Sequence, residues 1–441
     1  MRKIFKEALF LALFPWAFVC FQYNQCHGYF AESYGILFSF ITGICLINVL
    51  LLLVKLPANF IFASWLVLIL PNLAHNLYFN ILFEFFIALI IALALKKAPL
   101  QLIKVLLSII FCFNLFQIVQ RDFSARKTAQ NLIKNILINK NFSCDKNIYW
   151  IVCDAYTSAE VLRQYYHFSN EDFYNQLHYL GFLTLDGQVS YTQVNEFPTL
   201  KALNFYTNFN QFDVTQENAL TLHYCLKHNA LFNNLRQNGY TFSAKPTRFP
   251  FLHKLNDVKI LGETYRFTCF QFLYHCCKQN KFLGQLVSGY LNRMLYLQQE
   301  DVFQNFVNDI IIPGKNFYYL HIESPHAPFV REANNTYCND QKSVVWGENE
   351  VGKNAYAFED YQSEYVKQLQ GLNKKVLKLL TTISQKDPNG IIILQGDHGT
   401  FMTENLKEQQ SFLFAIKNTP FEGIKSEQFF KQFIYGEQFF E

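Results

Sequence analysis

Five long apolar runs fill the first 120 residues and constrain the fold of this chain more than any other feature of the sequence. A helix that crosses a membrane needs roughly 20 apolar residues, and about 17 is the lower limit. The whole chain has 441 residues, of which 51% are hydrophobic and 16% charged, and this composition excludes a disordered or collagen-like protein. We predict a transmembrane region at 1–120 with five spans, at about 8–23, 34–54, 59–74, 77–95 and 100–119.

Basic residues alternate between the loops that join these runs. Three precede the first run (Arg2, Lys3, Lys6), one lies between the second and third (Lys55), and two lie between the fourth and fifth (Lys96, Lys97). The loops near Gly28 and at 72–76 contain neither Lys nor Arg. Because basic residues stay on the cytoplasmic side, the N-terminus is expected inside. An odd number of spans then puts residues 121–441 on the outer side of the membrane.

The charge balance changes after the fifth run. Residues 121–441 carry 31 basic and 31 acidic residues, and the net charge of the whole chain is only +4, so the sequence gives no reason to expect a nucleic-acid partner. Basic residues mix with apolar residues at helical spacing over 121–146. This pattern predicts a connecting helix at the membrane surface, or an ordinary surface helix of the outer domain. Residues 147–441 are enough for one large core.

Three short apolar runs in the outer domain are typical of strands that are buried on both faces. They lie at 147–154, 316–321 and 390–399, and each is rich in β-branched or aromatic residues without polar alternation. A helical pattern over 360–384 precedes the third run. Helices that alternate with buried strands predict an α/β sandwich with a mostly parallel sheet.

Each predicted strand leads into residues that can bind or react. Asp154 follows the first strand, His321 ends the second with His326 close behind, and the third leads into Asp397 and His398. In open α/β sheets, ligands bind beyond the carboxyl ends of the strands, so these side chains are expected to converge. Aspartate and histidine together are ligands for divalent metals.

Three segments in this order resemble the sulfatase-like branch of the alkaline phosphatase superfamily: IVCDAY at 151–156, HIESPHAPF at 321–329 and LQGDHG at 394–399. The membrane layout resembles lipoteichoic acid synthases and phosphoethanolamine transferases, which carry five spans and an external catalytic domain. The resemblance implies an alkaline-phosphatase-like catalytic domain over 147–441. It also implies a metal-dependent transferase in a bacterial inner membrane, with this domain on the periplasmic side.

The resemblance implies the substrates as well. Such an enzyme moves a phosphorus-containing head group, phosphoethanolamine or phosphoglycerol, to a cell-surface acceptor. Membrane lipids and lipid-linked or cell-surface substrates are therefore the expected partners.

The resemblance also implies a nucleophile after the first strand. A threonine is expected at a helix N-terminus, and Thr199, directly after Pro198, matches this position. A hydroxyl there lies beside free backbone N–H groups, which favour an anion. Thr199 as a simple helix cap is the alternative, and Thr192 is the second choice for the nucleophile.

The remaining roles follow from the same resemblance. Asp154, Asp397, His398 and the Thr199 oxygen would bind one divalent ion, which could be Mn, Zn, Mg or Ca. His326 would contact the phosphoryl or leaving group. His321 is a further substrate-binding or supporting residue, or a structural histidine.

Two departures from the family pattern leave other functions open. Ala155 follows Asp154 where many relatives have a second acidic residue. The formylglycine sulfatases need Cys or Ser two residues before Pro and four before Arg, and no such run exists, although 243–248 comes close. This favours an unmodified threonine acting on a phosphorus ester. A sulfatase-type or phosphodiester hydrolase and a catalytically inactive membrane binding protein are the alternatives.

Overall fold

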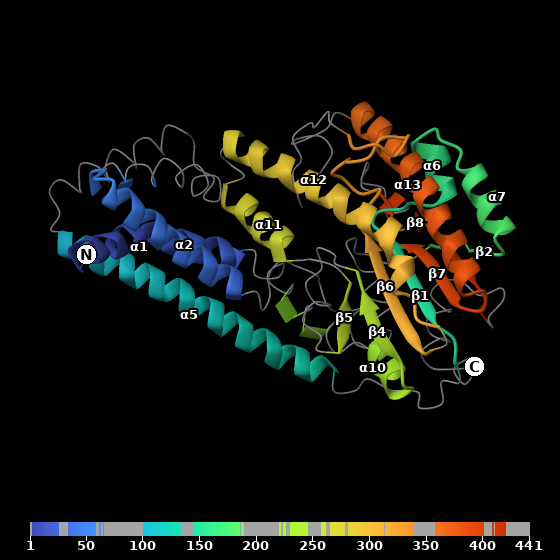
Figure 1. Ribbon diagram of the computed structural model, residues 1–441, viewed down its shortest axis with the longest axis horizontal. Helices are drawn as coiled ribbons and strands as arrows, with labels where there is room; N and C mark the ends of the chain where they lie inside the picture. Colours follow the sequence, from blue (N-terminus) through green and yellow to red (C-terminus); the bar gives the residue numbers. More distant parts are fainter. Residues whose placement is uncertain are drawn as a thin grey trace. The chain divides into compact units, whose positions relative to one another are not determined.

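A run of six apolar residues forms the central strand of the larger sheet in the computed structural model of the protein (Figure 1). This strand, β1 (Ile148–Cys153), is buried along its whole length. It pairs in parallel with β6 (Asn316–Ile322) on one side and β7 (Ile391–Gly396) on the other. The prediction of three buried parallel strands is confirmed, and the three strands are immediate neighbours.

The structure describes residues 2–25, 34–58, 61–62, 65, 100–133, 144–185, 187–188, 220–221, 224–225, 230–245, 257–261, 265–277, 281–312, 314–338, 358–400, 408–409 and 411–419.

The sheet has seven strands in the order β2-β9-β7-β1-β6-β4-β5. Five neighbouring strands, from β7 to β5, run parallel, and two antiparallel strands complete one edge. The sheet is therefore mixed but mostly parallel, as the sequence predicts. A separate pair joins β3 to β8. The remaining strands are β2 (Leu183–Thr184), β3 (Gly187–Gln188), β4 (Thr241–Ala244), β5 (Val258–Ile260), β8 (Ser411–Phe412) and β9 (Phe414–Lys417).

Helices cover both faces of this sheet (Figure 1). The long helix α13 (Phe358–Lys386) buries an apolar stripe in the main core, and it contains the predicted helix at 360–384. Phe232 packs on the opposite face, against the ring of Phe317 in β6. The other elements around the sheet are α6 (Ala159–Tyr165), α7 (Glu171–Tyr179), α10 (Ala230–Gln237), α12 (Lys281–Asn305) and η3 (Phe306–Asp309).

The chain divides into two compact units. The helical unit contains Met1–Thr128 together with two later stretches, Ala219–Thr221 and Tyr265–Ser288. The α/β unit contains the rest of the chain. The range 147–441, predicted as the catalytic domain, therefore includes two stretches that cluster with the N-terminal helices.

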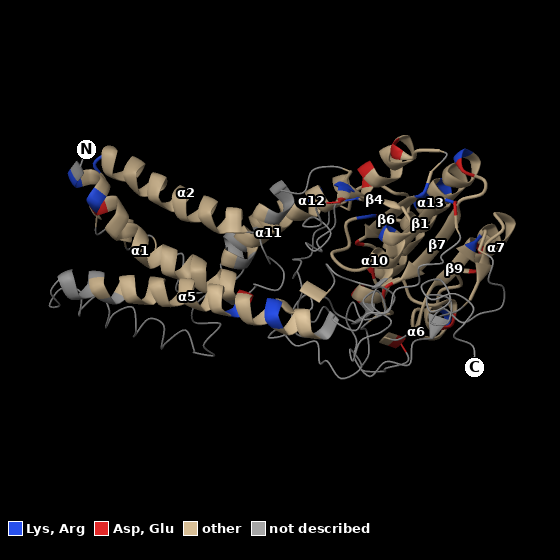
Figure 2. Ribbon diagram, turned by 90° about the horizontal axis from the view of Figure 1, so that it is seen from below, with Lys and Arg blue, Asp and Glu red and all other residues tan. Residues whose placement is uncertain are grey.

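The helical unit is built from α1 (Arg2–Gln25), α2 (Tyr34–Leu53), α5 (Leu100–Ile133) and α11 (Tyr265–Cys277). Within the part of the chain that the structure describes, two segments are long and apolar enough to cross a membrane, Lys3–Asn24 and Tyr34–Leu53. Figure 2 shows basic residues at the N-terminal end of α1, whereas α2 has no charged residue.

These two segments test the prediction of five spans only in part. They match the first and second predicted spans. The predicted spans 59–74 and 77–95 lie almost entirely outside the described residues. The fifth run lies in α5, which continues without a break to Ile133 and so extends into the predicted connecting helix at 121–146.

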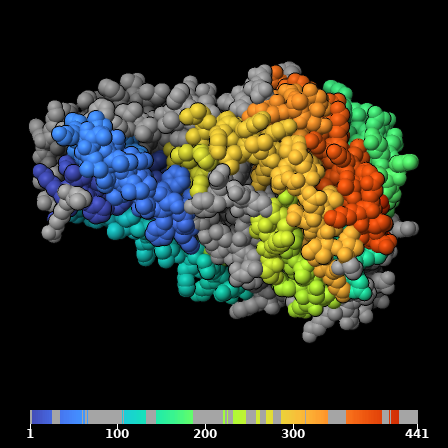
Figure 3. Space-filling view, in the orientation of Figure 1, coloured from blue at the N-terminus to red at the C-terminus, as the bar shows by residue number. Residues whose placement is uncertain are grey.

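The exposed faces of α2 and of α5 up to Val119 are mostly apolar. On α2, which lies at the surface in Figure 3, the exposed side chains include Phe38, Leu46 and Leu50. On α5 they include Ile109, Phe113, Phe116 and Val119.

Candidate metal centre

The parallel strands bring the predicted site residues to one edge of the sheet. Asp154 follows β1, His321 is the sixth residue of β6, and Asp397 and His398 follow β7. Because Cys153 pairs with Ile322 and with Gly396, the ends of the three strands lie level. His326 belongs to the loop after β6, and its backbone N–H donates to the Asp154 carbonyl at 3.0 Å. Asp154 and Asp397 are fully buried.

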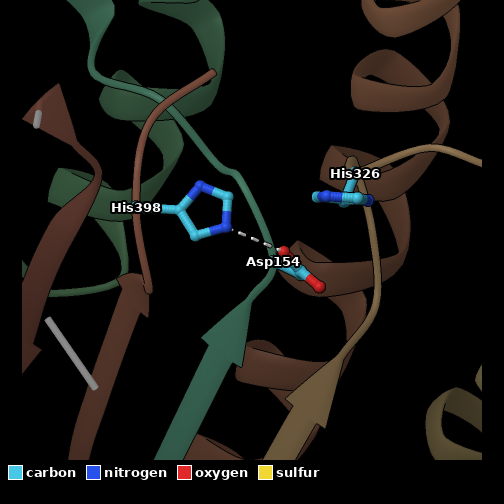
Figure 4. A group of neighbouring side chains, drawn as sticks. All are labelled: Asp154, His326 and His398. Carbon is cyan, nitrogen blue, oxygen red and sulfur yellow. Dashed lines mark ion pairs between the residues drawn. The ribbon is translucent and has the colours of Figure 1, made fainter. Parts of the chain in front are cut away.

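Two groups of three side chains lie close enough to hold a metal ion. Asp154, His326 and His398 form the first group, and Figure 4 shows them converging from three segments. Asp154, His321 and Asp397 form the second. In each group, one candidate ligand atom per residue lies within 4.8 Å of the others. The two groups share Asp154, so five side chains surround one small region.

The spacing of these atoms suits coordination. His398 Nε2 lies 3.4 Å from Asp154 Oδ1 and 3.8 Å from Asp397 Oδ2, and His321 Nε2 lies 3.6 Å from Asp397 Oδ2. Two ligands of a tetrahedral zinc ion, each bonded at about 2.0–2.1 Å, are about 3.4 Å apart. The observed distances lie close to this value.

The histidine rings are oriented by their second nitrogen atoms. His398 Nδ1 donates to the Gly399 carbonyl at 2.6 Å, and His326 Nδ1 donates to the Ala327 carbonyl at 2.5 Å. His321 Nδ1 lies 3.2 Å from the Tyr319 hydroxyl. Histidines that bind metals commonly make this kind of bond, which fixes the tautomer and leaves Nε2 available.

Asp397 has one oxygen held by the backbone and one available for a cation. Its Oδ1 accepts from the backbone N–H groups of Ala155 at 2.8 Å and His398 at 2.9 Å. Its Oδ2 is buried and accepts no hydrogen bond from the residues that the structure describes. A buried carboxylate oxygen without a donor is costly, and a metal ion would satisfy it.

The two buried carboxylates favour positive charge at the site. Burial of the His398 ring opposes its protonation, but the adjacent carboxylates of Asp397 and Asp154 outweigh burial and raise the pKa of His398 to about 9. The site therefore attracts positive charge, which a divalent ion would supply in place of a proton.

Two glycines at the end of β7, Gly396 and Gly399, flank Asp397 and His398 and let the backbone pack closely there. A Cβ atom on Gly396 would lie 2.4 Å from the Tyr156 carbonyl oxygen. On Gly399 it would lie 2.0 Å from the Glu408 carbonyl oxygen. Both positions need glycine because the backbone packs too closely for a side chain. The segment that carries Asp397 and His398 is therefore packed against the backbone of Tyr156 at one end and of Glu408 at the other.

Gln368 of α13 supports the loop that carries His326, and the sequence reasoning missed it. Its Nε2 donates to the carbonyls of Pro325 at 3.1 Å and His326 at 2.9 Å. Its Oε1 accepts from the backbone N–H groups of Val330 at 2.7 Å and Arg331 at 3.1 Å. Gln368 is fully buried. A polar residue one position before Leu369, within the apolar stripe of the helix, was the signal available in the sequence.

The predicted nucleophile Thr199 and its alternative Thr192 lie outside the described residues. Their position relative to the five side chains therefore stays a prediction.

Comparison with known proteins gives remote structural relatives only. No family model and no curated protein matches the sequence. Among solved structures, the integral membrane protein lipooligosaccharide phosphoethanolamine transferase A (EptA) of Neisseria meningitidis matches with 10% identity and a TM-score of 0.40, covering 96% of this chain and 91% of EptA. The lipoteichoic acid synthase LtaP of Listeria monocytogenes matches with 12% identity and a TM-score of 0.32, covering 68% of this chain and 73% of LtaP.

A Vibrio parahaemolyticus protein of the alkaline phosphatase superfamily matches with 10% identity and a TM-score of 0.32, covering 69% of this chain and 70% of its own. Similarity at this level does not assign an activity. The sequence motifs resemble the sulfatase-like branch of the alkaline phosphatase superfamily, and the solved structures that the chain matches include a member of that superfamily.

Proposed function

We propose that this protein is a membrane-anchored, metal-dependent transferase that moves a phosphorus-containing head group from a lipid-linked donor to a cell-surface acceptor. The observation that carries the proposal is the convergence of two buried aspartates and three histidines at the carboxyl edge of the sheet. Phosphoryl chemistry needs positive charge beside the transferred group, and this donor set suits a zinc or manganese ion.

Asp154, Asp397 and His398 would hold one divalent ion. His321 is close enough to Asp397 to act as a further ligand. The bound ion would supply Lewis-acid stabilisation of the phosphoryl oxygens and favour deprotonation of a nearby hydroxyl. In this proposal His326 remains the residue that contacts the phosphoryl or leaving group.

The proposed reaction has two steps. The Thr199 oxygen bonds to phosphorus while the bond to the donor oxygen breaks, which gives a phospho-threonine, and the donor leaves as an alcohol after taking up a proton. An acceptor hydroxyl then attacks the same phosphorus, loses its proton and restores the Thr199 hydroxyl.

The test separates the two catalytic roles by measuring metal content and product formation in two variants. Thr199→Ala should keep the fold and the metal, because loss of a helix cap costs only about 0.5–2 kcal/mol, yet abolish turnover. His326→Ala should slow turnover and keep the metal. Mass spectrometry of the Thr199 peptide after incubation with candidate lipids should detect the phosphorylated form.

Other outcomes of this test would change the assignment. Near-normal activity of Thr199→Ala would move the nucleophile to Thr192 or to water. Metal loss in His326→Ala would make His326 a metal ligand. Full activity in both variants would contradict the proposed mechanism.

We also propose that α1 and α2, together with the later spans predicted between residues 59 and 119, cross a bacterial inner membrane an odd number of times, with the N-terminus in the cytoplasm and the catalytic unit in the periplasm. The apolar composition of both helices and the basic residues Arg2, Lys3 and Lys6 support this orientation. Lys55, just after α2, would then be cytoplasmic. In a background without native cysteines, an impermeant reagent should miss Lys55→Cys and reach new cysteines in the catalytic unit. Labelling of Lys55→Cys from outside would contradict the orientation.

A further inference from the structure

The helical unit includes a helix from the middle of the chain. In sequence, α11 lies between β5 and β6, but it clusters with α1 and α2. Phe272 of α11 is fully buried. Its ring centroid lies 5.9 Å from that of Tyr23 in α1 and 4.9 Å from that of Phe40 in α2, with both pairs edge to face. Edge-to-face pairs of this kind stabilise a packed core.

One stripe of α11 makes this contact. Cys269, Phe272 and Cys276 are spaced by three and four residues, so they lie on one helix face, and all three belong to or pack against the core of the helical unit. The described side chains of α11, from Cys269 to Cys276, are buried or half-buried. This helix is therefore part of the core that α1 and α2 form.

The contacts of Phe272 set its depth along the two helices. Tyr23 lies two residues before the end of α1, and Phe40 lies six residues after the start of α2. At about 1.5 Å per residue, these contacts are about 3 Å and about 9 Å from the two helix ends. Both of these ends are opposite the basic N-terminus of α1. Helices that lie in the membrane interface are typically buried by about 5–10 Å, and the contacts of Phe272, at about 3 Å and about 9 Å, lie around this depth.

The composition of this stretch also suits the interface. Five of the 13 residues of α11 are aromatic, and Arg266 is its one Lys, Arg, Asp or Glu. Two of the five are tyrosines, Tyr265 and Tyr274, and tyrosine concentrates where the lipid headgroups meet the hydrocarbon. Further along, in the part of α12 that belongs to the helical unit, Leu286 is 63% exposed.

We propose that Tyr265–Ser288 is an interfacial membrane anchor that lies in the outer leaflet, where Phe272 holds it to α1 and α2 and Leu286 contacts lipid. The partner is the lipid bilayer itself. The inference rests on the membrane crossing of α1 and α2 under the proposed function. It adds that the chain returns to the membrane before β6, the strand that carries His321.

Depth-dependent fluorescence quenching tests this anchor. An environment-sensitive fluorescent amino acid is introduced at one position at a time in the full-length protein, reconstituted into phosphatidylethanolamine and phosphatidylglycerol vesicles. The vesicles carry a nitroxide either near the headgroup or near the end of the acyl chain. Four exposed positions are compared: Leu286 as the probe, Phe38 and Leu46 on α2 as shallow and deep references, and Tyr179 of α7 as the aqueous control.

At Leu286 we expect a larger loss of emission with the headgroup nitroxide than with the chain-end nitroxide, as at Phe38. Leu46 should show the reverse, because it lies about 18 Å along α2 from Tyr34. Tyr179 should lose little emission with either lipid. If Phe38 and Leu46 respond but Leu286 behaves like Tyr179, the anchor is disproved while the membrane crossing stands. A Leu286 response that matches Leu46 would disprove the interfacial depth. If neither Phe38 nor Leu46 responds, the membrane crossing itself fails.

Discussion

The two units of this protein place their apolar side chains in opposite positions. In the helical unit, large apolar residues of α2 and α5 are exposed along the outer faces. In the α/β unit, β1, β6 and β7 and the inner stripe of α13 bury theirs in one core. Burial of apolar surface away from water drives folding only in a water-soluble unit. Under the proposed function, this difference corresponds to two solvents, lipid around the helical unit and water around the α/β unit.

The α/β unit repeats such a contrast between the two edges of its sheet. At the amino edge, Asp387 Oδ2 accepts from Asn147 Nδ2 at 2.9 Å and from the Tyr149 hydroxyl at 2.8 Å, so two neutral donors satisfy this buried carboxylate oxygen. At the carboxyl edge, Asp397 faces Asp154 and two histidines, and its Oδ2 has no donor among the described residues. One buried carboxylate supports the fold, and the other is available to a cation.

The largest effect is expected from removing the carboxylate at the carboxyl edge. Asp397→Ala should lose its bound metal and all measurable turnover, because it removes a charged ligand that no neighbour can replace. Metal content by mass spectrometry and head-group transfer are the measurements. Asp387→Asn is the matched control, since it changes a buried carboxylate of the same sheet at the other edge. It should lower stability but keep the metal. Equal metal loss in both variants would remove the distinction between the edges.

The second prediction concerns a buried ion pair in the α/β unit. Glu300 of α12 accepts from Arg331 and from Lys375, each at 2.6 Å, and the Arg331 side chain is fully buried. Arg331→Met should cost about 3–5 kcal/mol in the free energy of unfolding, the range for a buried pair that loses one partner. Denaturant unfolding measures this. The exposed pair Lys367 and Glu364 provides the control, and Lys367→Met should change stability by less than about 1 kcal/mol.

The same pair predicts a dependence on pH. Burial of Glu300 raises its pKa, but the hydrogen bonds from Lys375 and Arg331 outweigh burial and lower the pKa below the ordinary value of 4.5. A lowered pKa in the folded state stabilises the protein above pH 4.5, and this contribution is lost as the pH falls below it. Arg331→Met should therefore weaken the dependence of stability on pH in that acid range. An unchanged acid dependence would contradict this role for Arg331.

The third prediction compares a charge placed on each unit. Leu46 of α2 is 58% exposed, and Leu297 of α12, in the α/β unit, is 51% exposed. If Leu46 faces lipid, Leu46→Lys should cost about 3–4 kcal/mol on the insertion scale. Leu297→Lys should change stability by less than about 0.5 kcal/mol, as a surface substitution in water. Membrane integration measures the first and denaturant unfolding the second. Normal integration of Leu46→Lys would show that this face does not meet the bilayer centre.

The strands that form the centre of the α/β unit could be predicted because each is a continuous apolar run, and such a run indicates burial on both faces of a sheet. The placement of Asp154, Asp397 and His398 at one edge followed from the rule for parallel strands. The two-residue strands β2 and β8 have no such pattern. The membership of α11 in the helical unit depends on contacts between Phe272 and residues more than 200 positions away, so no local pattern indicates it. The proximity of His321 to Asp397 likewise needed the register of β6 against β1.

The smallest expected effect concerns Gln368, which holds the His326 loop against α13. Gln368→Leu keeps the size of the side chain but removes its bonds to five backbone groups of the loop. A shift of His326 by about 1 Å should slow turnover by about 10–100-fold, because the position of a catalytic group controls the rate. The metal should remain, since the bonds of Gln368 within the described residues go to the backbone of the loop and not to Asp154, Asp397 or His398. Gln362 of the same helix provides the control: its Nε2 donates only to the Tyr165 carbonyl, at 2.6 Å, in the described structure, so Gln362→Leu should keep near-normal turnover. A fall in kcat at unchanged KM and metal content, in Gln368→Leu alone, would support positioning of His326. Normal kcat in a folded Gln368→Leu protein would show that the loop holds His326 without this side chain.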